Sequence, residues 1–157
     1  YGAKNVTCVD MSQLACDAVT KHARLNHLDN LLALKADVFL LLRELKTQNK
    51  SYGVVILDPP AFTKNLENVN KAYAGYKEIN IQAMKLIEDG GYLITNSCSH
   101  YMTPALFLEM LMEAANDSGR IAQMVEFRMQ GKDHPALLGG DESFYLKCVV
   151  LRILDKN

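Results

Sequence analysis

A run of apolar, mostly β-branched residues at 54–57 stops at the acid and two prolines of Asp58-Pro59-Pro60. Such a run predicts a strand that is buried on both faces. The prolines end it, because proline lacks a backbone N–H and has a fixed φ. We therefore expect Asp58 at the carboxyl end of a central strand, where open α/β sheets bind ligands. Phe62 follows in the loop, where it could form a wall for a flat ring.

Strand and helix signals alternate along the whole chain. Ser12 and Asp37 are suitable N-caps, Thr103-Pro104 is a helix start, and Gly90-Gly91 is expected to end a helix. This alternation predicts an α/β fold with a Rossmann-like, doubly wound and mostly parallel sheet, whose last two strands are antiparallel. The expected strands are 5–9, 31–36, 54–57, 92–95, 121–129 and 144–154, and the expected helices are 12–27, 38–46, 71–88 and 103–119.

The composition is that of an ordinary globular domain. The chain has 157 residues, 49% of them hydrophobic, and a formal net charge of -1. The charge gives no global basic field, so a polyanionic substrate would have to be gripped by a local patch or by another domain. The four cysteines show no paired spacing, which suggests neither a metal site nor a disulfide framework. Reduced thiols in a cytoplasmic protein are the expectation.

Acidic residues follow three successive predicted strands, at Asp10, Asp37 and Asp58. A carboxylate at such a strand end can accept hydrogen bonds from a ribose diol, as in dinucleotide-binding folds. Asp10 and Asp37 could equally be helix caps or turn residues. Asp58 could bind a base edge or an exocyclic amine, or could simply end its strand in a turn. The three together favour a nucleoside ligand more than any one of them alone.

Cys98 is the candidate nucleophile. It follows a predicted strand end, between Ser97 and Ser99 and close to His100. A catalytic thiol needs such a polar and partly exposed setting, because the thiolate is the reactive form. A buried structural role is the alternative. The other cysteines, at positions 8, 16 and 148, are expected to pack in strands or on a helix.

Three further residues are weaker candidates. Tyr76 and Lys77 follow the Asp58 loop and could touch a base or a phosphate, although an ordinary helix face explains them about as well. His134 lies in a polar loop, either as a surface residue or as part of an active-site lid.

With these residues in place, the chain resembles the class I S-adenosylmethionine-dependent methyltransferases that make 5-methylcytosine in large-subunit ribosomal RNA. The subgroup is the one in which a PUA domain precedes the methyltransferase domain. The motifs lie in the family's order over nearly the whole chain. They are Gly2-Ala3-Lys4-Asn5-Val6-Thr7-Cys8-Val9-Asp10, Ala36-Asp37-Val38-Phe39, Leu57-Asp58-Pro59-Pro60-Ala61-Phe62, Gly75-Tyr76-Lys77-Glu78-Ile79-Asn80, Ser97-Cys98-Ser99 and Asp133-His134-Pro135.

The resemblance implies a role for each matching residue. Asp10 would bind the ribose of S-adenosylmethionine, and Asp37 its adenine amino group. Asp58 would hold a cytosine that is flipped out or already unpaired, and Cys98 would add to C6 of that ring. The residues around the base would be Pro59, Pro60, Phe62, Tyr76, Lys77 and His134. The implied partner is ribosomal RNA, no metal or membrane is implied, and a homodimer stays open.

Two expected parts of the family are missing from the sequence. The chain begins at Tyr1-Gly2-Ala3-Lys4-Asn5 without Met and runs straight into a strand. The glycine-rich methyl-donor loop and the first strand before it are not found, and neither is the PUA domain. We expect residues 1–157 to be the C-terminal part of a longer protein. A gap should then open in the sheet between the strands that end at Asp10 and Asp58.

Three other functions stay open at this point. Acid-Pro-Pro-aromatic signatures also occur in enzymes that methylate a guanine or adenine nitrogen, although here Ala61 separates Pro60 from Phe62. The missing loop would also fit a non-catalytic RNA-binding fragment. A nicotinamide-dependent oxidoreductase fits Asp10 but not Asp58-Pro59-Pro60.

Overall fold

The structure is a computed structural model that describes residues 2–63 and 65–156. The chain divides into two compact units, Tyr1–Glu44 and Leu45–Asn157, each of which is described by itself. No helix of the described residues is long and apolar enough to cross a membrane.

The first unit is built on two parallel strands. Strand β1 (Val6–Asp10) pairs with β2 (Leu31–Lys35), and helix α1 (Gln13–Leu25) connects them. The predicted cap of α1 is confirmed, because Ser12 Oγ accepts a hydrogen bond from the Ala15 N–H at 3.3 Å. Asp37 caps the next helix, α2 (Val38–Thr47), by accepting from the Phe39 N–H at 2.8 Å.

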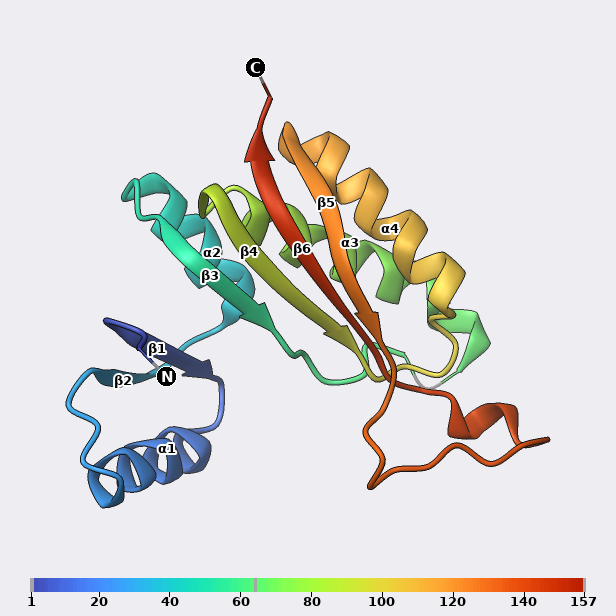
Figure 1. Ribbon diagram of the computed structural model, residues 1–157, viewed down its shortest axis with the longest axis horizontal. Helices are drawn as coiled ribbons and strands as arrows, with labels where there is room; N and C mark the ends of the chain where they lie inside the picture. The colour runs from blue at the N-terminus through green and yellow to red at the C-terminus, as the bar shows by residue number, and fades with distance from the viewer. Residues whose placement is uncertain (1, 64, 157) are drawn as a thin grey trace. The chain divides into compact units, whose positions relative to one another are not determined.

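The second unit is a four-stranded sheet in the order β3-β4-β6-β5. Strands β3 and β4 are parallel, and β6 runs antiparallel to both of its neighbours, as predicted for the last two strands. Helices α3 and α4 pack together against the sheet (Figure 1). The strands are β3 (Tyr52–Leu57), β4 (Ile87–Ser97), β5 (Arg120–Arg128) and β6 (Lys147–Asp155), the helices are α3 (Val69–Met84) and α4 (Pro104–Ser118), and two 3-10 turns lie at Leu66–Asn68 and Asp141–Ser143.

The core of the second unit lies on one face of its sheet. Alternate residues of β4 and β6 are buried there, including Leu93, Val149 and Ile153, together with Phe107 and Met110 of α4. Helix α4 begins and ends as predicted. Its N-cap Thr103 accepts from the Leu106 N–H, and it closes at Gly119 with a positive φ of 74°.

The end of α3 differs from the prediction. The helix was expected to run to residue 88 and to end at Gly90-Gly91, but α3 stops at Met84 and β4 begins at Ile87. Ile87 is buried and pairs with Tyr52 of β3, so its apolar side chain belongs to the sheet. Arg120 Nη1 donates to the carbonyls of Met84 and Ile87 at 3.3 and 2.9 Å, which satisfies the backbone at this break.

Strand β3 is less buried than predicted. Leu57 is buried, but Val54 and Ile56 are 53% and 63% exposed. The reason is that β3 is an edge strand here, since among the described strands it pairs only with β4. Strand β1 likewise pairs only with β2 within the described chain. The described strands therefore form two separate sheets, one in each unit.

Candidate functional site

Asp58 and Cys98 follow two adjacent parallel strands. Strand β3 ends at Leu57, which lies opposite Thr95 of β4, and β4 ends two residues later at Ser97. The side chain of Asn96 donates to the Leu57 carbonyl at 3.0 Å, which fixes the two strand ends to each other. Parallel strands end at the same edge of a sheet, so both predicted residues emerge at one edge. Asp58 is exposed and Cys98 is half-buried.

A buried hydrogen-bond network holds the segment after Cys98. Ser99 Oγ donates to the Thr63 carbonyl at 3.3 Å and lies 3.3 Å from the hydroxyl of Tyr76. The Ser99 N–H donates to Ser97 Oγ at 3.4 Å. The network joins the loop after β3, helix α3 and the segment after β4. It fixes the backbone on both sides of the cysteine.

Tyr76 is a supporting residue in this structure. Its side chain is fully buried, with its ring 4.5 Å from that of Phe62 and 5.9 Å from that of Phe107. Gly75 makes room for this packing, because a Cβ there would lie 3.3 Å from the Phe62 ring. Phe62 therefore packs on α3 through Tyr76. Pro59 is half-buried and Pro60 is exposed beside Asp58.

Lys77 and His134 lie in different settings. Lys77 Nζ contacts carboxylates of α4, Glu113 at 2.7 Å and Asp117 at 2.9 Å. These hydrogen bonds raise the pKa of Lys77 and bind its ammonium group within the α3–α4 pair. His134 lies on the exposed loop between β5 and β6, 3.9 Å from the carboxylate of Asp133. Lys77 is thus engaged with α4, and His134 lies in an exposed loop.

Lys147 is a residue that the sequence analysis missed. It opens β6 opposite Ser97, its side chain is 0% exposed, and its Nζ donates to the Ser99 carbonyl at 2.6 Å and the Tyr145 carbonyl at 2.7 Å. Burial lowers the pKa of Lys147 to about 8, and its electrostatic interaction with Cys98 opposes that shift. A lysine inside the apolar run at 144–151 was the signal that could have found it.

The next residue, Cys148, connects Asp58 to the same strand. Burial raises the pKa of the Cys148 thiol, and the charges of Glu126 and Asp58 raise it further, while Arg128 lowers it. Cys148 lies opposite Asn96 in the β4–β6 pair.

Asp10 is the last residue of β1, and Asp37 lies two residues after the end of β2. Asp10 Oδ1 accepts from the Ser12 N–H at 2.7 Å, and Asp37 Oδ1 accepts from the Phe39 N–H. Each residue thus has the turn or cap role that the sequence left open. A carboxylate has a second oxygen, so this role is compatible with accepting hydrogen bonds from a ribose or an amine. The chemistry of these residues fits the nucleoside part of S-adenosylmethionine.

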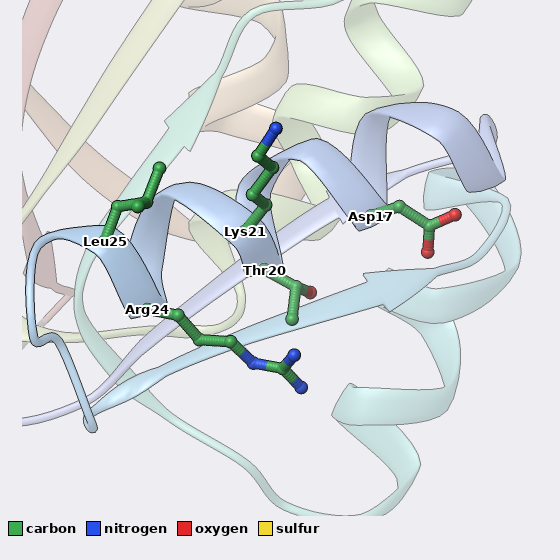
Figure 2. Close-up of a pocket in the computed structure, with 5 residues that line it drawn as sticks. All are labelled: Asp17, Thr20, Lys21, Arg24 and Leu25. Atoms are coloured by element: carbon green, nitrogen blue, oxygen red, sulfur yellow. The ribbon is translucent and has the colours of Figure 1, made fainter.

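Two surface hollows are each lined by residues of a single unit. One lies along α1 and is lined by Asp17, Thr20, Lys21, Arg24 and Leu25 (Figure 2). Asp17 in this hollow already accepts from the side chain of Gln13 at 2.9 Å. The other lies over α4 and β5, with Met112 and Met124 in its lining. Neither contains a predicted site residue.

Comparison with known proteins places the sequence in a family. The family described as "Conserved hypothetical protein 95" matches residues 1–121. The chain is 43% identical over 153 residues to the ribosomal RNA large subunit methyltransferase I of Aeromonas salmonicida, covering 96% of this chain and 39% of that protein. It is 42% identical over 154 residues to the protein of the same name from Shewanella amazonensis, covering 97% and 39%. The chain spans about two fifths of the length of these relatives.

Solved structures identify the fold. SMU.776, solved in complex with SAH, aligns with a TM-score of 0.83 and 21% identity over 96% of this chain and 40% of that chain. The N-methyltransferase NodS from Bradyrhizobium japonicum aligns with a TM-score of 0.62 and 14% identity over 97% and 75%. The predicted Rossmann-like α/β fold is confirmed. The chain belongs to the family described as Conserved hypothetical protein 95, and its fold is that of the class I S-adenosylmethionine-dependent methyltransferases.

Proposed function

We propose that residues 1–157 are the methyltransferase domain of a protein that transfers a methyl group from S-adenosylmethionine to C5 of a cytosine in ribosomal RNA. The observation that carries the proposal is the placement of Asp58 and Cys98 after adjacent parallel strands, at one edge of a class I methyltransferase sheet. The name shared by the relatives, ribosomal RNA large subunit methyltransferase I, supports the substrate class.

Cys98 is the proposed nucleophile. Its thiolate adds to C6 of the cytosine, and the electrons of the C5–C6 double bond move to C5 and, through C4, to the ring nitrogen N3. The addition makes C5 electron-rich enough to accept a methyl group. Loss of the C5 proton to a base then restores the double bond and expels the sulfur, which regenerates the thiolate. The half-buried position of Cys98 allows a ring to reach it while limiting its contact with water.

Asp58 is the proposed anchor for the base. An exposed carboxylate directly after β3 can accept a hydrogen bond from the exocyclic amine of cytosine. Pro59 and Pro60 restrict the backbone that carries it, because each fixes its own φ. This rigidity keeps the base in one orientation while the thiolate attacks.

Asp10 and Asp37 are the proposed contacts for the methyl donor. Bound S-adenosylmethionine supplies an electrophilic methyl group. The two carboxylates would hold its ribose hydroxyls and its adenine amine, respectively. Both side chains are already oriented by backbone N–H groups, so little conformational freedom is lost on binding.

A trapping experiment tests the role of Cys98. The full-length protein is mixed with S-adenosylmethionine and with RNA in which cytosine is replaced by 5-fluorocytosine. Fluorine cannot leave as the C5 proton does, so the enzyme–RNA adduct persists. We expect a methyl-donor-dependent adduct in the wild type and in the control Cys148→Ser, but none in Cys98→Ser. An undiminished adduct in Cys98→Ser would refute the proposal.

Further measurements on the same proteins distinguish cytosine methylation from the two alternative functions. Methylation retained in Cys98→Ala, with mass spectrometry locating the group on a guanine or adenine nitrogen, would establish amine methylation instead. Calorimetry with S-adenosylmethionine tests the remaining alternative. Failure of the full-length protein to bind the donor would leave a non-catalytic RNA-binding role.

A further inference from the structure

Lys147 is a buried cation without a carboxylate partner in the part of the chain that the structure describes. Its side chain is 0% exposed, and its Nζ contacts two neutral carbonyl oxygens, those of Ser99 and Tyr145. Burying an ammonium group is costly unless an opposite charge compensates it. Lys147 therefore places a positive charge without a compensating carboxylate beside the end of β4.

The position of Lys147 brings it next to the segment that carries Cys98. Its backbone lies opposite Ser97, the residue before Cys98, and its Nζ holds the carbonyl of Ser99, the residue after Cys98. Lys147 thus contacts the chain on both sides of the cysteine. Cys98 is also the side chain whose electrostatic interaction with Lys147 opposes the lowering of the Lys147 pKa by burial. An ammonium has three N–H donors, and the two carbonyls use two of them.

We propose that Lys147 is a positioning residue that stabilises the thiolate of Cys98 and fixes the 97–99 segment for attack on the base. This inference rests on the proposed function, because it takes Cys98 as the nucleophile. A positive charge near a thiol favours its ionised form, which is the form that reacts. The hydrogen bond to the Ser99 carbonyl adds orientation, because it ties the start of β6 to the residue that follows Cys98.

A purely structural role for Lys147 makes a different prediction. In that case the residue only ties the segment after β4 to the segment before β6, through the carbonyls of Ser99 and Tyr145. Lys147→Gln separates the two roles, because an amide can still donate to a carbonyl but carries no charge. Lys147→Met removes both the charge and the donors while keeping an unbranched stem. Lys71→Met, at an exposed lysine of α3, is the matched control for the loss of one positive charge.

The measurement is the rate of iodoacetamide alkylation at Cys98 in the full-length protein, followed by mass spectrometry of its peptide without RNA or methyl donor. At pH 7 we expect about a 10-fold slower rate in Lys147→Gln and Lys147→Met than in the wild type and Lys71→Met. At pH 9.5 the rates should converge, because hydroxide ionises the thiol in every variant. Convergence also shows that the variants have not simply closed access to the sulfur.

A wild-type alkylation rate at pH 7 in Lys147→Gln would overturn the inference, and so would a deficit that persists unchanged at pH 9.5. If Lys147→Met does not fold, Lys147→Gln alone decides the question. The outcome is independent of the trapping experiment. If alkylation of Cys98 is slowed in the Lys147 variants but the wild type forms no RNA adduct, cytosine methylation is refuted and the role of Lys147 stands. If the alkylation rate is unchanged in the Lys147 variants but the wild type forms the adduct, the role of Lys147 is refuted and cytosine methylation stands.

Discussion

The hydroxyl group of Tyr76 lies 3.3 Å from Ser99 Oγ, which joins helix α3 to the segment that carries Cys98. Ser99 Oγ uses its one hydrogen to donate to the Thr63 carbonyl, so Tyr76 is the donor to Ser99. All three residues are buried. The nucleophile proposed here is therefore held by the core of the unit and not by a free loop.

Tyr76→Phe should destabilise the protein by about 1 kcal/mol, because it removes one buried hydrogen bond and leaves the packing of the ring intact. Urea unfolding followed by circular dichroism measures the change. Tyr92→Phe is the control, since the Tyr92 side chain is 40% exposed. Equal unfolding midpoints for the two variants would contradict the network.

Gly75→Ala should fail to stabilise the protein. Alanine in a helix interior is normally favoured over glycine by about 1 kcal/mol. Here the new Cβ would lie 3.3 Å from the Phe62 ring, which is itself packed on Tyr76. The stabilisation by alanine should appear only when Phe62→Ala removes the ring. Chemical unfolding measures the effect of Gly75→Ala on the free energy of unfolding in the wild-type and Phe62→Ala backgrounds. An equal stabilisation in both backgrounds would exclude coupling between positions 75 and 62.

Glu113→Gln should lower thermal stability at neutral pH but not in acid. The hydrogen bond from Lys77 lowers the pKa of the Glu113 carboxyl. A group with a depressed pKa in the folded state stabilises the protein above its unfolded pKa, and this contribution is lost as pH falls through the folded value. The difference in Tm between wild type and Glu113→Gln should thus shrink from pH 7 toward pH 3. Glu109→Gln on the same helix is the control, and a pH-independent difference would contradict the assignment.

Asp10→Asn should weaken the binding of S-adenosylmethionine to the full-length protein by about 10-fold, the effect expected from losing a charge-assisted hydrogen bond. Asparagine still has an oxygen that can accept from the Ser12 N–H, so the turn is kept. Isothermal calorimetry measures the affinity. Asp17→Asn, on the outer surface of α1, should bind like the wild type. Equal affinity of Asp10→Asn and the wild type would remove Asp10 from the donor site.

Local signals in the sequence determined most of the elements. The caps at Ser12, Asp37 and Thr103 and the stop at Gly119 act within one helical turn, so the nearby residues suffice to predict them. The run that ends at Asp58-Pro59-Pro60 likewise placed a strand end correctly. The α/β class followed from the alternation of these signals.

Some residues fit more than one local pattern, and only the tertiary structure decided in which element they lie and what they contact. Ile87 fits a helix stripe in the sequence, but its pairing with β3 and the bonds from Arg120 assign it to β4. Tyr76 has a side chain that could serve a surface or a core, and its packing between Phe62 and Phe107 buries it. Lys147 lies 49 residues after Cys98 along the chain and meets its segment only because β6 pairs with β4. Contacts of this range depend on the register of distant strands, which local sequence does not specify.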